Sequence, residues 1–116
     1  MYNYVFLIGR TTKDIVIKET KDGKKVCNVT LAVRRSFKNQ DGEYDTDFIR
    51  VTIWENLANV IDGSVKKGEL IGIKGRLCTK KFVLASEAVA LASEVVAERI
   101  VFLNNTREED LEEYVK

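Results

Sequence analysis

The segment TDFIRVTIWENL, residues 46–57, contains a strand with large side chains on both of its faces. Successive strand residues point to opposite sides of a sheet, so one face is the aliphatic row Ile49, Val51 and Ile53. The other face carries an aromatic, a cation, a hydroxyl and the chain's only tryptophan, in the order Phe48, Arg50, Thr52 and Trp54. A second hydrophobic layer would exclude Arg50, and a solvated face would rarely carry two aromatics. We therefore expect this face to meet a flat, anionic partner.

The segments before this strand read as further strands joined by tight turns. An apolar run at residues 4–10 is followed by strand-like runs at 15–20 and 25–35. Asp22-Gly23 lies between the last two runs, and Asp41-Gly42 precedes the returning strand at 47–54; Asp-Gly pairs favour hairpin turns. The sequence predicts a set of short antiparallel strands.

The segments after it change period and then return to strands. Apolar residues recur at helical spacing through Leu57, Val60, Ile61 and Val65, and Lys66–Gly68 is a suitable helix end. Two more strand-like runs follow, at residues 69–82 and 94–103. Three strands, one helix and two strands predict an all-β fold, a five-stranded OB-fold barrel with its helix between strands 3 and 4.

Composition limits the function classes. The chain has 116 residues, the size of one domain, and no apolar run approaches the ~18 residues of a membrane span. It has no histidine, which removes the commonest general base and metal ligand, and no nucleophile or phosphate-loop motif takes its place. We expect no catalytic residue, no metal and no cofactor. With no leader at MYNYVFLIGR, we expect a cytoplasmic, nucleoid-associated protein.

The net charge of +1 hides an asymmetry. Residues 107–116 hold two bases and five acids, which leaves 17 bases and 13 acids in the rest of the chain. We expect a mildly basic domain at residues 1–104, followed by a short acidic tail at 105–116. Such a mildly basic domain is compatible with a polyanionic partner.

Cations and aromatics also share the noncore face of other predicted strands. One strand offers Lys74, Arg76, Lys80 and Phe82, and Phe37 lies close to Arg34 near the end of another. Unpaired bases stack on aromatic rings while a cationic groove follows the phosphates. Each aromatic alone could be a core residue, and a lone basic face is usually just solvated. Their coincidence on separate strands favours single-stranded nucleic acid.

Longer segments resemble the bacterial single-stranded DNA-binding protein family. They are FLIGR, VTLAVRRSFKNQDGEYDTDFIRVTIW, VKKGELIGIKGRLCTKKF and EVVAERIVFL, and the resemblance covers about residues 1–104. It implies an OB fold, a homotetramer (a dimer is the alternative) and base stacking by Phe37, Phe48, Trp54 and Phe82. It implies phosphate contacts by Arg50, Lys67, Lys80 and Lys81, although strand parity places Lys81 opposite Lys80. Parity adds three phosphate candidates, Arg34, Lys74 and Arg76.

The chain departs from the family pattern in two places. Residues 83–94 read VLASEAVALASE where relatives carry a polar, glycine-containing hairpin tip. Local propensity there favours a helix, but we expect paired strands, with a short helix or disorder as alternatives. The chain also has no proline and ends in EEDLEEYVK, so the family's acidic Pro-Phe recruiting tip is absent.

These observations support a leading hypothesis and two rivals. The leading one is sequence-independent binding and protection of single-stranded DNA in replication, recombination and repair, by a protein that is not an enzyme. The first rival is an OB-fold protein-interaction module, a primosome-like or accessory relative, with weak nucleic-acid affinity. The second is an RNA-binding OB domain, since stacking does not itself distinguish ribose from deoxyribose. The apolar run at residues 4–10 is expected to pack against another subunit.

Overall fold

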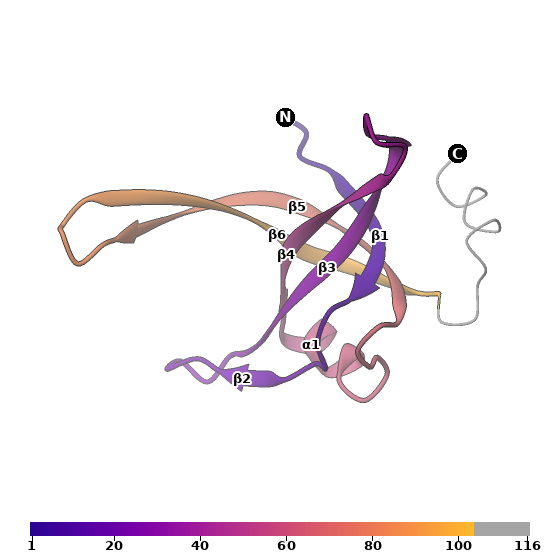
Figure 1. Cartoon of the computed structure of the whole chain (residues 1–116). Helices are drawn as coiled ribbons and strands as arrows, with labels where there is room; N and C mark the ends of the chain where they lie inside the picture. The colour runs from indigo at the N-terminus through magenta and orange to yellow at the C-terminus, as the bar shows by residue number, and fades with distance from the viewer. Residues whose placement is uncertain (104–116) are drawn as a thin grey trace.

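The computed structural model describes residues 1–103 and contains six strands and one helix within them (Figure 1). The elements are β1 Val5–Thr11, β2 Ile17–Glu19, β3 Lys25–Lys38, β4 Tyr44–Trp54, α1 Glu55–Ile61, β5 Leu70–Val83 and β6 Val89–Phe102. The predicted acidic tail at 105–116 lies outside the described residues.

Five of the strands close into a barrel. The sheet order is β1-β5-β6-β4-β3-β2, and β1 also pairs with β3, which completes the ring. Among the described residues the strand pairings are antiparallel except that of β4 with β6, which is parallel through Val51↔Val95 and Thr52↔Val96. Within residues 1–103, β2 pairs with β3 alone and so lies outside the ring. The predicted five-stranded barrel with one helix is confirmed.

The barrel interior is filled by the aliphatic faces that strand parity predicts. Leu31 of β3, Ile53 of β4 and Ile73 of β5 are fully buried. Fully burying a side chain of this size contributes about 1.5–3 kcal/mol, so alternation along each strand fixes which face turns inward.

The helix is shorter than the sequence suggests. It ends at Ile61, whereas the helical spacing predicts that it continues toward Gly68. Gly63 lies in the left-handed region at φ +79°, which glycine adopts without steric cost and which ends the helix here. Ala58 and Ile61 are buried against the barrel, while Val60 is exposed. No helix in residues 1–103 is long and apolar enough to cross a membrane.

Beyond the barrel, β5 and β6 continue as a long two-stranded arm that projects from the body (Figure 1). The pairing runs out to Val83↔Val89, and a turn closes it with the Leu84 N–H donating to the Ala88 carbonyl at 2.9 Å. The prediction that this segment pairs as strands is confirmed. Cross-strand hydrogen bonds override the helix propensity of an Ala- and Leu-rich sequence, which is a weak preference.

Candidate nucleic-acid interface

The outward faces of β3 and β4 form one continuous surface. Phe48 pairs with Ala32, Arg50 with Thr30, Thr52 with Asn28 and Trp54 with Val26. Paired residues of an antiparallel ladder point to the same side, so Phe48, Arg50 and Trp54 stand in a column beside small and polar side chains. The partition of this strand into a core face and a second, aromatic and cationic face is therefore present in the structure.

Three of the candidate aromatics are exposed. Phe37, Phe48 and Phe82 are 63%, 67% and 46% exposed. These values remove the alternative in which each phenylalanine is a core residue. Trp54 is partly buried at the point where β4 meets α1, where it lines a small cavity of about 190 Å³ with Lys24 and Glu55. Whether any of the four stacks on a base stays a prediction.

A polar network joins β4, β5 and β6 on this outer face. The Thr52 hydroxyl donates to Glu94 Oε2 at 2.6 Å, and Lys80 Nζ lies 3.0 Å from Glu94 Oε1. Burial by itself raises the pKa of Glu94, but the Thr52 hydrogen bond and the Lys80 ammonium outweigh it, so the pKa lies below its ordinary value. The structure thus holds Lys80 at the base of the arm beside the Phe48–Trp54 column.

The other cations predicted on β5 have different neighbours. Lys74 lies 3.0 Å from Glu98 and over the ring of Tyr4, with 5.5 Å from its Nζ to the ring centroid. It pairs with Phe6 of β1, so it belongs to the β1 side of the barrel rather than to the β4 column. Arg76 Nη1 lies 2.9 Å from Cys78 Sγ. Arg76 pairs with Val96 of β6, and Val96 pairs with Thr52 of β4, so Arg76 lies in the same row as Thr52.

Lys81 lies on the opposite side of β5 from Lys80, and Lys67 lies outside the strands. The β5–β6 register is continuous from Gly75 to Val83 and pairs Lys81 with Leu91, so Lys81 points away from the side that carries Lys80. The register shift in this ladder lies between Lys74 and Gly75 and does not alter that parity. Lys67 lies between α1 and β5, where its backbone N–H donates to Asp14 Oδ1 at 2.9 Å.

Arg34 and Phe37 lie at the far end of β3. Arg34 pairs with Thr46, which keeps it on the Phe48 side, and its guanidinium carbon is 5.1 Å from the Tyr44 ring centroid. The ladder register shifts between Arg34 and Lys38, so simple alternation does not determine the side on which Phe37 lies.

Sequence reasoning missed two participants on this surface. Glu94 was not a candidate, because its approach to Thr52 depends on the parallel β4–β6 pairing that closes the barrel. Arg10 was also missed; it pairs with Ala32 across the β1–β3 closure and so shares a row with Phe48. In both cases the partners are far apart in sequence, and no local pattern links them. Within residues 1–103 no group of His, Cys, Asp and Glu side chains is placed to hold a metal ion.

The closed five-stranded barrel with its one helix defines an OB-fold protein, and its outer face carries exposed aromatic and cationic side chains. The chain belongs to the Single-strand binding protein family, whose model matches residues 2–103. That membership confirms the prediction that the chain is a binding protein and not an enzyme.

Individual relatives match along most of the chain. It is 38% identical over 104 residues to Single-stranded DNA-binding protein B of Bacillus subtilis, which covers 90% of this chain and 92% of that protein. It is 42% identical over 103 residues to the Single-stranded DNA-binding protein of Bacillus cereus, of which it covers 61%. Among solved structures, the Plasmodium falciparum SSB complex with ssDNA has a TM-score of 0.77 and 25% identity, covering 89% of this chain and 96% of that one.

Proposed function

We propose that this protein binds single-stranded DNA without sequence preference and protects it during replication, recombination and repair. The observation that carries the proposal is the outward column of Phe48, Arg50 and Trp54 on β4, on a chain that belongs to the Single-strand binding protein family. The names of its relatives, and the single-stranded DNA with which the similar solved protein forms its complex, support the same partner.

The mechanism follows from what such a surface can do. Each base stacked on an aromatic ring contributes roughly 1–3 kcal/mol and needs no particular hydrogen-bonding edge, so binding tolerates any sequence. Phosphate neutralisation by neighbouring cations releases counterions and makes the affinity fall with salt. Because the protein binds only the unpaired strand, it opens hairpins by mass action.

The residue roles within this proposal are of two kinds. The stacking residues are Phe37, Phe48, Trp54 and Phe82. The phosphate contacts are Arg34, Arg50, Lys67, Lys74, Arg76, Lys80 and Lys81. Strand parity supports Arg50 and Lys80 most directly, because both share the outer face with the aromatics. Lys67 and Lys81 rest on the family resemblance alone.

The test is a fluorescence titration of Trp54 with poly(dT), with duplex DNA and poly(U) as competitors, at two salt concentrations. We expect strong quenching by poly(dT), little by duplex, and weaker binding at higher salt. Trp54→Ala should lower the affinity by roughly 1–3 kcal/mol in a separate binding assay. Preference for poly(U) would point to RNA. If neither polymer binds, the proposed function fails. The exposed apolar arm would then favour the protein-interaction hypothesis.

We propose further that the protein assembles as a homotetramer through the outer face of β1. Phe6 and Ile8 lie on this face beside Gly72 and Val101. A Cβ atom at Gly72 would lie 3.5 Å from Phe6 and from Val101, which is ordinary van der Waals contact. Phe6→Glu should place a charge in this apolar patch and dissociate the assembly. Sedimentation velocity distinguishes the tetramer, the alternative dimer, and the monomer that would contradict the proposal.

The remaining expectations are also proposals. Residues 1–104 form the DNA-binding domain and 105–116 an acidic tail, which the charge distribution of the sequence supports. A cytoplasmic, nucleoid-associated location follows from the proposed binding of single-stranded DNA during replication, recombination and repair. Fluorescence microscopy of a tagged protein would check this, and exclusion from the nucleoid would contradict it.

A further inference from the structure

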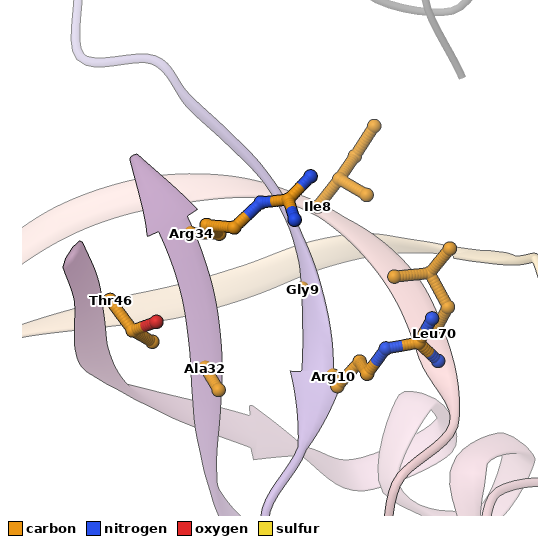
Figure 2. Close-up of a pocket in the computed structure, with 7 residues that line it drawn as sticks. All are labelled: Ile8, Gly9, Arg10, Ala32, Arg34, Thr46 and Leu70. Atoms are coloured by element: carbon orange, nitrogen blue, oxygen red, sulfur yellow. The ribbon is translucent and has the colours of Figure 1, made fainter. Parts of the chain in front are cut away.

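The outer surface of the barrel carries charge, whereas the end of the arm, residues 81–93, carries very little. Figure 2 shows the guanidinium groups of Arg10 and Arg34 beside the open pocket where β1 and β3 separate. Residues 81–93 contain one cation, Lys81, and one anion, Glu87. Charged side chains normally keep exposed strands from associating with other chains. The end of the arm has only this one pair of charges for that purpose.

Strand pairing divides the end of the arm into two faces. Lys81 pairs with Leu91 and Val83 pairs with Val89, so these four side chains point to one side. Phe82 lies between two of them in β5 and therefore points to the opposite side, which is the proposed stacking side. We call Val83, Val89 and Leu91 the apolar face of the arm.

The apolar face continues the inner face of the barrel into water. Val95 of β6 is 3% exposed and packs in the core. Pairing is regular from Leu77↔Val95 to Val83↔Val89, so alternation along β6 turns Leu91 and Val89 to the same side as Val95. In the single chain, Val83, Val89 and Leu91 are nevertheless 77%, 63% and 68% exposed. They are core-type side chains that a second layer would bury.

A second layer would also stabilise the arm itself. The arm projects from the barrel as two strands (Figure 1). A two-stranded hairpin is only marginally stable, whereas three or more strands with a buried apolar face are stable. Two arms packed on one another supply four strands with apolar side chains between them. A second arm therefore meets this need with side chains of the same kind.

The charges at the end of the arm favour a second copy as the occupant. The Val83–Val89 row lies two residues, roughly 7 Å, from Lys81 on the barrel side. Glu87 lies on the other side of this row, in the turn at the tip. A twofold axis over the Val83–Val89 row would place two arms antiparallel, with Lys81 of each copy near Glu87 of the other. The arm is thus complementary in charge to itself.

We propose that the apolar face of the arm is a self-association surface, which packs against the same face of a second copy of this chain. The contact involves neither the outer face of β1 nor nucleic acid, so it goes beyond the proposed function. A standard interface buries about 800 Å² per partner, and the few side chains at the end of the arm offer less. The contact is therefore weak and forms at high protein concentration, not in the dilute solutions used to measure unfolding.

The first test is chemical crosslinking through a single introduced cysteine in the full chain. Val89→Cys lies next to the proposed twofold axis, and Ala90→Cys, the matched control, points to the opposite side. Both are made together with Cys78→Ser, because Cys27 is buried and Cys78 is partly accessible. Packed sheets lie about 10 Å apart, so a short bis-maleimide can join two copies. We expect covalent dimers of Val89→Cys at high protein concentration, their loss on dilution, and none of Ala90→Cys.

The second test measures self-association without a crosslinker. Leu91→Gln places an amide on the apolar face, and Ala90→Gln places the same group on the opposite face; neither alters the net charge. An isologous contact loses the buried leucine of both copies, so Leu91→Gln should weaken association at least about tenfold. Ala90→Gln should keep the wild-type association constant. Sedimentation equilibrium over a concentration series measures both, and circular dichroism checks that the fold is unchanged.

Each outcome decides for or against the arm contact. Equal crosslinking of the two cysteine variants would overturn the inference, and so would the absence of dimers from both. Wild-type protein that forms no larger species at high concentration, or a Leu91→Gln variant that associates as the wild type does, would refute it too. Neither readout contains nucleic acid. Failure to bind poly(dT) would therefore refute the proposed function alone, and failure of these two tests would refute the arm contact alone.

Discussion

The strands β5 and β6 pass through two different environments, the barrel and the arm. Between Leu70 and Gly75, β5 has β1 on one side and β6 on the other, and Ile73 is fully buried. In the arm, among the described residues, β5 pairs with β6 alone, and Val83 and Leu91 are 77% and 68% exposed. The same two strands are held by packing at one end and by cross-strand hydrogen bonds at the other.

This difference shows which interactions decide local structure. In the barrel, burial decides which residues can occupy the inner face. In the arm, aliphatic side chains contribute little because they stay in water, and a two-stranded hairpin by itself is only marginally stable. The arm therefore depends on its attachment to the barrel, and its sequence can drift toward Ala, Val and Leu without changing the fold.

The largest expected effect comes from truncating one leucine in each region. Leu31→Ala should destabilise the protein by about 2–5 kcal/mol, because Leu31 is fully buried and the change leaves a cavity. Leu91→Ala, the same chemical change in the arm, should alter the free energy of unfolding by less than about 0.5 kcal/mol. Urea unfolding measures both. A cost above about 1 kcal/mol for Leu91→Ala would show that the arm is packed against a partner or another subunit.

The next effect concerns the point where the arm leaves the barrel. A Cβ atom at Gly75 would lie 2.2 Å from the Val96 carbonyl oxygen, so Gly75→Ala must displace backbone at the register shift. We expect a loss of about 1–3 kcal/mol in urea unfolding. Gly72→Ala is the control, because its nearest contacts are 3.5 Å from side chains. Equal stability of the two variants would mean that the junction is not rigid.

The barrel could be predicted because the patterns that indicate its strands and turns lie within short stretches of sequence. Alternation along β4 separates Ile53 from Trp54, and an Asp-Gly pair at residues 41–42 identifies the β3–β4 turn, so a large part of the candidate face follows from one hairpin. The helix was predicted in the right place, but it ends earlier because Gly63 adopts a conformation that periodicity does not reveal.

The rest of the candidate site depends on closure of the ring. Glu94 meets Thr52 only through the parallel β4–β6 contact, and Arg10 joins the Phe48 row only through β1–β3. Such pairings join residues far apart in sequence, so no spacing rule signals them. Phe37 differs from these, because the register shift between Arg34 and Lys38 means that alternation cannot determine its side, and its stacking role stays a prediction.

A smaller effect is expected at the tip of the arm. Glu87 has φ 66°, a left-handed conformation that costs a non-glycine residue roughly 1 kcal/mol. Glu87→Gly should relieve this strain and increase the hydrogen-exchange protection of the Leu84 amide by up to about fivefold, with the global unfolding midpoint unchanged. Ser86→Gly is the control, since Ser86 has no positive φ to relieve. Equal protection in both variants would contradict a strained turn.

The smallest expected effect tests Glu94, which lies where the arm meets the barrel. Glu94→Gln should release Lys80 and remove a negative charge from the outer face, so poly(dT) binding at low salt should tighten about two- to fivefold, the size of a partly exposed ion pair. Glu19→Gln is the matched control, because it removes the same charge from an exposed position on β2, outside the barrel ring. Equal tightening in both variants would indicate net charge alone.

The same carboxylate also predicts a pH dependence of stability. Since the pKa of Glu94 is lower in the folded chain than its ordinary value of 4.5, its ionised form favours folding. That contribution is complete above the unfolded pKa and is lost as the pH falls from about 4.5 through the folded pKa. Glu94→Gln should therefore flatten the decline in unfolding free energy on the acid side, as urea titrations at about pH 3–6 would measure. An unchanged acid decline would show that the Thr52 and Lys80 contacts do not favour the charged form, and that the arm is not coupled electrostatically to the barrel.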